Sequence, residues 1–364
     1  MRPSAIISGP AEPGSAVTDR IRQQLAPVLD AITIESGNSV RFADLDPVSI
    51  PSSEQAPPTA AAAATHPLVE PLAQLIYNLA YARPLHTGAR LFLDHGQKLP
   101  KIMETDAEFL SRLSAANCSR ERWDSMWRVY ELRENGGLSV EKRSTNRLVL
   151  AGQFIFNQTV ARAPAIGENV SVYAPKESIG TQAGFYFAFG ETISSDYDDA
   201  HLSRFYFNMN PDRVPWLIER LSVLLNRHRI AYRLKCLANP LFYERMDPVV
   251  LYVAKRFVPA FMRLFAGARN ELADRLRDGT PLLTKPMLNG MGAADEPGGG
   301  FSFGQSRSRL LSEGVVDAWL AGDQSSNSRL WHISRRFRRS GLSLASPHLS
   351  EGAKDLYEWP SEDE

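Results

Sequence analysis

Apolar residues recur at helical spacing in several segments of the chain. Residues 17–31 and 68–85 place Leu, Ile and Val three or four positions apart, which predicts amphipathic helices. The same spacing predicts a helical stretch over 106–130, a long helix over about 249–276 and a last helix from about 301. Asn210 and Pro211 supply an N-cap and a first-turn proline for one more helix.

Alternating, aromatic-rich segments predict strands from about residue 138 onward. LSVEKR and NRLVLAG flank a turn at 144–146, and SVYAP, GFYFAFG, SRFYFNMN and AYRLKCL follow. The last two strands enclose a helix, and this order suggests a parallel crossover unit. We therefore predict an α+β fold, with a helical N-terminal part followed by a mixed β-sheet domain with packed helices.

Composition divides the chain further. Residues 1–65 are predicted to be a flexible segment with one helix and a Pro/Ala-rich linker at 47–65. A helical N-terminal domain over 66–137 and an α+β domain over 138–321 follow. The Ser- and Arg-rich tail at 322–364 is expected to be only partly ordered, with its arginines solvated.

Net charge excludes some partners. The 364 residues contain 41 basic and 41 acidic side chains, so we expect neither nucleic acid nor a membrane as partner. Two cysteines, Cys118 and Cys236, fit a reducing cytoplasm, and the N-terminus lacks the long apolar run of a signal peptide. Metal-ligand spacing, the P-loop, HExxH and GxSxG are absent from the sequence, and we expect no metal.

Cations fall at unusual places in the predicted sheet domain. A charge inside an apolar strand is costly unless it is paired or faces a ligand, and a Gly-rich loop that enters a helix binds anions readily. Arg204 opens one strand and Lys235 lies inside another, on the same face as Arg233. Further cations and loop residues are Arg245, Lys285, Arg307, Ser302 and Gly304. Together they predict a basic, phosphate-sized pocket at one edge of the sheet.

Each cation also has a purely structural interpretation. Arg245 and Asp247 could form an ion pair, Arg204 could protect an edge strand, and Lys235 could be exposed. Trp123 and Trp127 are interpreted as a helical i,i+4 pair in the core. From these patterns alone, the protein is an α+β protein with a possible anion site.

The order of motifs from Ser203 onward resembles the HopA-type effector family. The string SRFYFNMNP is followed by RLKCL, YERMD, LLTKP, ADEPGGG and FSFGQSRSR. The resemblance is specific over 203–320 and extends to 127–202, and it is greatest to the lyase component of class V lanthipeptide and thioamitide biosynthesis. Many relatives have Cys where this chain has Ser308, so a cysteine is not expected to be essential there.

The resemblance implies a phosphoserine/phosphothreonine lyase without a cofactor. A kinase-like partner of the same pathway phosphorylates a ribosomal precursor peptide, and the lyase β-eliminates the phosphate to leave dehydroalanine or dehydrobutyrine. The implied location is the bacterial cytoplasm. The alternative is a secreted effector, or a scaffold module, that binds a phosphorylated protein or peptide without catalysis.

Roles within this chemistry can be assigned as hypotheses. Lys235 is the expected general base, with Lys285 or Lys142 as alternatives. Asp247 would orient Arg245 or protonate the leaving group, a role that Tyr252 or Tyr206 could take instead. The remaining phosphate- or substrate-binding candidates are Arg204, Arg245, Arg307, Asn208, Ser302 and Gly304.

Overall fold

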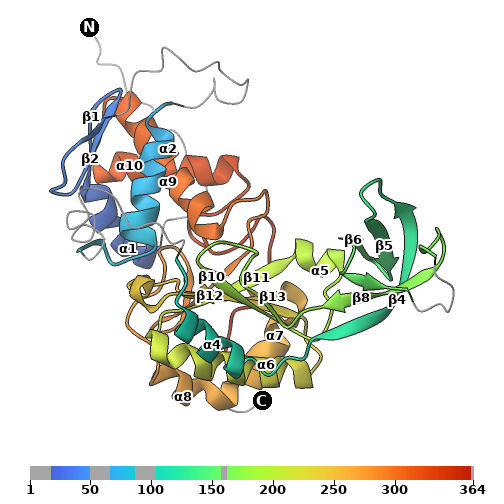
Figure 1. Ribbon diagram of the computed structural model, residues 1–364. Helices are drawn as coiled ribbons and strands as arrows, with labels where there is room; N and C mark the ends of the chain where they lie inside the picture. Colours follow the sequence, from blue (N-terminus) through green and yellow to red (C-terminus); the bar gives the residue numbers. More distant parts are fainter. Residues whose placement is uncertain (1–17, 50–65, 87–103, 157–161, 362–364) are drawn as a thin grey trace, which may run out of the picture.

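A seven-stranded antiparallel sheet forms the centre of the molecule (Figure 1). The computed structural model describes residues 18–49, 66–86, 104–156 and 162–361. The strand order is β14-β15-β11-β13-β12-β10-β9. Their bounds are β9 (Glu177–Ser178), β10 (Phe185–Phe189), β11 (Leu202–Phe207), β12 (Tyr232–Leu237), β13 (Val249–Ala254), β14 (Lys285–Leu288) and β15 (Met291–Asp295). The α+β class predicted from the sequence is confirmed.

The predicted parallel crossover unit does not form a parallel pair, because another strand lies between its two strands. β11, α6 (Val214–Arg227) and β12 follow one another, and β11 and β12 point the same way. However, β13 lies between them and is antiparallel to both, so neighbouring strands are antiparallel rather than mixed. Residues 249–254 form this strand instead of the first turns of the predicted long helix. The run VVLYVA is buried throughout and rich in β-branched residues, which suits a central strand.

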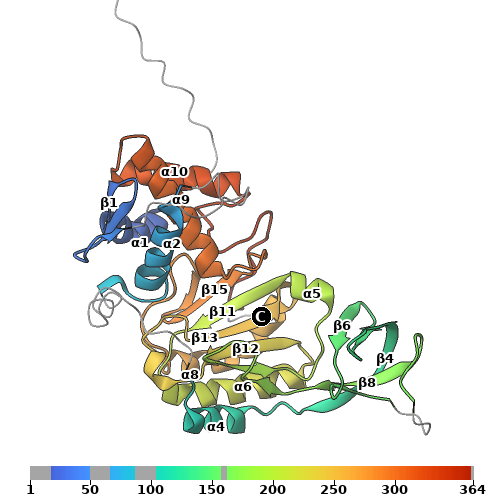
Figure 2. The ribbon, with the colours of Figure 1, turned by 45° about the horizontal axis from the view of Figure 1, so that its top comes forward.

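Helices on one face of the central sheet bury its apolar side (Figure 2). They are α4 (Ala107–Ala116), α6, α7 (Val258–Phe265) and α8 (Arg269–Ala273). Phe205, Leu234 and Leu251 point into this core, because alternate residues of a strand face opposite sides of a sheet. The predicted capping by Asn210 takes another form, since a 3-10 turn at Pro211–Arg213 precedes α6 without a side-chain cap.

A helical layer packs against the opposite face. It contains α1 (Asp19–Asp30), α2 (Val69–Ile76), which continues as the π-helix η2 (Tyr77–Tyr81), α9 (Phe303–Leu320) and α10 (Ser326–Arg339). The small sheet of β1 (Ile32–Ser36), β2 (Ser39–Phe42) and β3 (Val48–Ser49) completes it. The helices predicted at 17–31, at 68–85 and from 301 are confirmed. Within the linker predicted at 47–65, residues 48 and 49 form β3, and residues 50–65 lie outside the described residues.

The expectation of a partly ordered tail is wrong, because α10 packs along α9. Gly314 permits the close approach: a Cβ at this position would lie 2.5 Å from Cα of Ile333. Arg336 on α10 also pairs with Asp317 on α9 through contacts of 2.6 and 2.7 Å. No described helix is both long enough and apolar enough to cross a membrane.

A five-stranded sheet, which we call the side sheet, extends from the central body. Its order is β6-β5-β4-β8-β7, with β4 (Arg122–Leu132), β5 (Leu138–Lys142), β6 (Thr145–Val149), β7 (Phe154–Ile155) and β8 (Asn169–Ala174). The helix predicted over 106–130 is therefore correct only for α4. A break in pairing between Asp124 and Trp127 turns Trp127 into the core while Trp123 stays 44% exposed, so the two do not form a helical pair.

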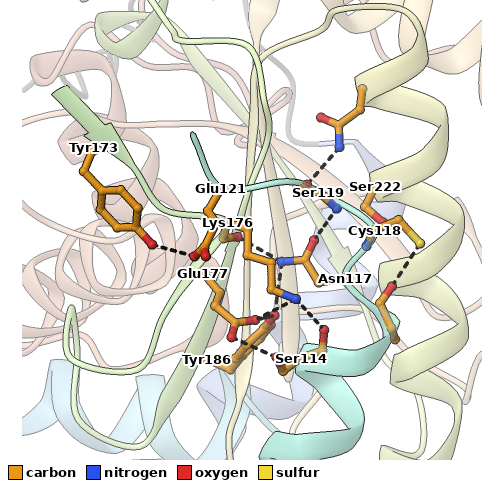
Figure 3. A network of polar contacts seen from close by, with 12 residues as sticks. Ser114, Asn117, Cys118, Ser119, Glu121, Tyr173, Lys176, Glu177, Tyr186 and Ser222 are labelled. Carbon is orange, nitrogen blue, oxygen red and sulfur yellow. Dashed lines mark hydrogen bonds and ion pairs between the residues drawn. The ribbon is translucent and has the colours of Figure 1, made fainter. Parts of the chain in front are cut away.

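Hydrogen bonds hold the side sheet where it leaves the central sheet (Figure 3). Asn117 donates to the carbonyl of Lys176 (2.9 Å) and to the Tyr186 hydroxyl (3.2 Å). Glu177 accepts from Tyr186 (2.7 Å) and from Ser114 (2.8 Å). Ser114 and Asn117 precede β4, Lys176 and Glu177 follow β8, and Tyr186 lies on β10, so these contacts fix both strands of the side sheet to the central sheet.

Candidate functional site

The face of the central sheet under the helical layer carries charged and phenolic side chains in register. Arg204 on β11 and Arg233 on β12 are both cross-strand partners of Tyr252 on β13. In the neighbouring row of the same face, Val250 lies between Tyr206 and Lys235. The strands thus place Arg204 and Lys235 over one area of the sheet, because alternation puts both on the face opposite to Phe205 and Leu234.

A cleft of about 700 Å³ lies over this area, with a smaller pocket of about 60 Å³ at its base. We call the two together the central cleft. Its walls come from β11–β13, from η2 and from the Gly-rich loop before α9. Its polar lining comprises Tyr77, Asn78, Tyr81, Arg83, Gln182, Arg204, Tyr206, Lys235, Arg245, Asp247, Tyr252, Glu296, Ser302 and Gln305.

Arg204 and Arg245, two of the arginines predicted from the sequence, each have a carboxylate partner in the wall of the central cleft. Arg245 donates from Nε and Nη2 to Asp247 (2.7 and 2.8 Å) and also from Nη2 to the Tyr77 hydroxyl (3.1 Å). Arg204 forms a two-pronged pair with Glu296 and is not on an edge strand, because β11 lies between β15 and β13. Two nitrogens of each guanidinium are thus held, and Nη1 of each makes no hydrogen bond to a described residue.

Lys235 lines the central cleft and has no counter-ion among the described residues. Its ammonium lies 3.8 Å from the centre of the Phe185 ring and donates to Oε1 of Gln182 (2.6 Å). Burial lowers its pKa to about 8, and Arg204 and Arg245 act in the same direction, while Asp247 opposes them. A substantial neutral fraction at moderately alkaline pH follows, and a neutral amine can accept a proton.

The Gly-rich loop brings the N-terminus of α9 to the central cleft. Gly298, Gly299 and Gly300 have φ between 66° and 79°, a region that favours glycine. The Ser302 hydroxyl accepts from the amide of Gln305 at 3.3 Å and retains its own proton for a ligand. Gly304 lies just inside the helix, where a Cβ would overlap the rings of Tyr81 and Tyr77.

Two tyrosines of the predicted set line the inner part of the cleft. The ring of Tyr252 lies between the guanidiniums of Arg204 (5.1 Å) and Arg233 (4.6 Å). The buried hydroxyl of Tyr206 lies beside Tyr81 and Arg204, but no described residue completes a hydrogen bond with it in good geometry. Burial raises the pKa of Tyr252, so its hydroxyl stays protonated.

Arg307 and Asn208 lie outside the central cleft and hold the chain. Arg307 is 1% exposed, stacks on Phe303, and donates to the carbonyls of Pro347 (2.7 Å) and Leu349 (3.0 Å). Asn208 donates to the carbonyls at 278 and 279 (2.8 and 3.1 Å). The structure thus corrects their predicted place at the phosphate.

Both alternative bases also lie away from the cleft. Lys285 on β14 pairs with Asp355 (2.9 Å), and Lys142 in the side sheet pairs with Asp124 (2.7 Å). A paired lysine in another part of the fold cannot reach a substrate held between Arg204 and Arg245. Among the described residues, no group of three or more His, Cys, Asp or Glu side chains could hold a metal ion.

Comparison with known proteins finds a family model that matches part of the chain. Residues 177–349 match the HopA1 effector protein family, and they include Arg204, Lys235, Arg245 and Ser302. The match covers less than half of the chain, and we call the matched segment the HopA1-type domain. Its bounds take in the central sheet and α9, whereas the side sheet and η2 lie before it.

Two solved effector structures are similar to the chain. An effector protein from Pseudomonas syringae pv. tomato shares 19% identity and a TM-score of 0.37, and the match covers 46% of this chain and 63% of that one. The chain thus spans less than two thirds of that protein. An effector protein from Pseudomonas syringae pv. syringae shares 12% identity and a TM-score of 0.38, with 69% and 85% covered. Among the curated proteins, none matches the chain.

Several cleft residues were missed by the sequence reasoning. Tyr77 and Arg83 come from outside the HopA1-type domain, and Gln182, Phe185 and Glu296 come from within it. Arg83 is 5% exposed, its Nε has no hydrogen bond, and burial followed by Arg245 lowers its pKa to about 10. A signal existed for this residue, because Arg83 directly follows the apolar stretch Leu-Ala-Tyr-Ala at 79–82, and a cation buried there needs a partner or a ligand.

Proposed function

We propose that this protein is a phosphoserine/phosphothreonine lyase that acts on a phosphorylated ribosomal precursor peptide. The observation that carries the proposal is Lys235, an unpaired lysine with a pKa of about 8 beside Arg204 and Arg245. A base next to cations is the pair of functions that β-elimination of phosphate requires.

The proposed reaction removes one proton and one phosphate. The neutral Nζ of Lys235 takes the proton from Cα of the phosphorylated residue. The electron pair of that C–H bond forms the Cα=Cβ double bond, the Cβ–O bond breaks, and phosphate leaves with the electrons of that bond. The product is dehydroalanine from phosphoserine or dehydrobutyrine from phosphothreonine.

The phosphate would be held by donors that the fold leaves available. These are Nη1 of Arg204 and of Arg245 and the Ser302 hydroxyl, and the guanidinium of Arg83 lines the same cleft. In this proposal Asp247 orients Arg245 through their two hydrogen bonds. Tyr252, which keeps its proton, donates it to the departing phosphate.

Mass spectrometry of a synthetic phosphoserine or phosphothreonine peptide tests the proposal. Incubation with the purified protein should remove one H₃PO₄ from the peptide, whereas loss of HPO₃ would indicate a phosphatase. Lys235→Ala should abolish the loss. Lys285→Ala and Lys142→Ala should retain it, as should the exposed control Lys354→Ala.

The family match favours a second candidate, an effector that captures a phosphorylated protein without chemistry. The same cleft would then bind a phosphopeptide and release it unchanged, even when a kinase-like partner is added. Phosphopeptide binding that needs Arg245 but gives no mass change would support this candidate. The bacterial cytoplasm is the location proposed for the lyase, and secretion is the one proposed for the effector.

A further inference from the structure

A second cleft opens on the far side of Tyr252, between the central sheet and the side sheet. Its volume is about 300 Å³, and we call it the arginine cleft after Arg122, Arg147 and Arg233, which line it. Strands β4, β6 and β8 form one wall, and β10, β12 and β13 form the other. The contacts of Figure 3 hold β4 and β8 at their junction with the central sheet, so this space is part of the fold.

The side chains of the three arginines donate no hydrogen bond to a described residue. Arg147 lies over the Trp127 ring at 5.1 Å and makes no hydrogen bond or ion pair there, and burial lowers its pKa. Arg233 contacts the ring of Tyr252, and Arg122 has its nearest carboxylate at 4.0 Å, in Asp124. One acidic residue, Asp199, lines the cleft with them. Asp124 and Asp196 also act on Arg147, but no described carboxylate accepts a hydrogen bond from the three guanidiniums, so their N–H groups remain free to bind an anion.

Strand register gives the distance between the two clefts. Arg204, Tyr252 and Arg233 lie side by side on consecutive strands, and adjacent strands are about 4.8 Å apart, so Arg233 lies about 10 Å from Arg204 across the sheet. Tyr252 lines both clefts. An extended peptide advances about 3.3 Å per residue, so about three residues cover this distance.

We infer that the arginine cleft binds an acidic side chain of the peptide substrate, about three or four residues from the phosphorylated residue in the central cleft. The inference rests on the proposed function and adds a sequence preference to it. A glutamate or aspartate carboxylate and a second phosphate offer the same anionic oxygens, and the experiment below distinguishes them.

Binding of peptides that cannot react tests the inference separately from catalysis. The probe is a fluorescein-labelled peptide in which a phosphonate with CH₂ in place of the bridging oxygen replaces phosphoserine, so that no phosphate can leave. Versions carry Glu, Gln or phosphoserine three or four residues to either side. Fluorescence anisotropy should show about tenfold tighter binding of the Glu version than of the Gln version on one side.

Variants assign that preference to the arginine cleft. Arg147→Gln and Arg233→Gln should each remove the difference between the Glu and Gln peptides, and Arg147→Gln should leave the affinity for the Gln peptide unchanged. Arg128→Gln is the matched control, because Arg128 also lies in the side sheet but pairs with Glu141 outside the cleft. Arg147→Lys, which keeps the charge, should retain part of the preference if the loss reflects charge rather than misfolding.

The outcomes separate the two proposals. Equal affinity for the Glu and Gln peptides, with no gain from the second phosphate, overturns the inference, as does a preference that survives in both Gln variants. If only the peptide with the second phosphate binds more tightly, the arginine cleft is an anion site whose ligand is phosphate rather than a carboxylate. If the phosphonate peptides bind with the predicted preference but no phosphate is eliminated from the phosphoserine peptide, the lyase proposal is refuted. The proposed role of the arginine cleft is then retained.

Discussion

The pH dependence of elimination is the sharpest test of Lys235 as the base. With a pKa of about 8, the neutral fraction of this lysine rises from about 9% at pH 7 to about 91% at pH 9. Because the neutral amine accepts the proton, kcat/KM should rise about tenfold over this interval and level off above it. The substrate phosphate ionises near pH 6 and adds little change in this range.

The environment of Lys235 predicts the direction of a further shift. Arg233 lies two residues away on the same face of β12 and lowers the pKa of Lys235. Removing that cation in Arg233→Gln should raise this pKa and move the midpoint of the rate profile to higher pH. Arg128→Gln, which lies in the side sheet, should leave the midpoint where it is.

Initial rates of phosphate release at constant ionic strength, from pH 7 to 9.5, measure this profile. A rate that falls about tenfold as the pH rises would refute the reasoning, because it would mean that Lys235 must be charged to hold phosphate. A rate that climbs about a hundredfold from pH 7 to 9 without levelling would indicate a base with the ordinary pKa of a lysine, which contradicts a lowered pKa for the base.

Three further predictions concern the fold around the site. Gly314→Ala should lower the free energy of unfolding in urea by about 1–2 kcal/mol, since the overlap with Ile333 outweighs the better helix propensity of alanine; Gly267→Ala, which meets open space, should not. Arg307→Met should speed amide hydrogen exchange over 344–357, because it removes the hydrogen bonds to the carbonyls of Pro347 and Leu349, and should change KM little. A raised KM with unchanged exchange would instead mean that Arg307 binds the phosphate. A thiol reagent at pH 8 should modify Cys118 alone until the protein is unfolded, because burial raises the pKa of Cys236 to about 12; two equivalents in the native state would contradict this.

Periodicity in the sequence was sufficient where an element has one apolar face and one polar face. The helices α1, α2, α6 and α9 and the strands β5, β6, β8, β10, β11 and β12 lie where the pattern predicted them. It failed at VVLYVA in β13, because a strand buried on both faces shows no alternation and resembles a buried helix. It failed again in β4, where a break in pairing places Trp123 and Trp127 on opposite faces.

The cations of the site show what only the tertiary structure decides. The sequence alone singled out Arg204, Lys235 and Arg245, because a charge within an apolar segment must be compensated. A cation looks the same in sequence whether a carboxylate, a carbonyl or a ligand compensates it. Chain folding supplied Asp355 for Lys285 and two carbonyls for Arg307, and it brought Arg83 to the cleft from 121 positions before Arg204. Local pattern therefore determines which residues need partners, and long-range packing determines which of them are left for a substrate.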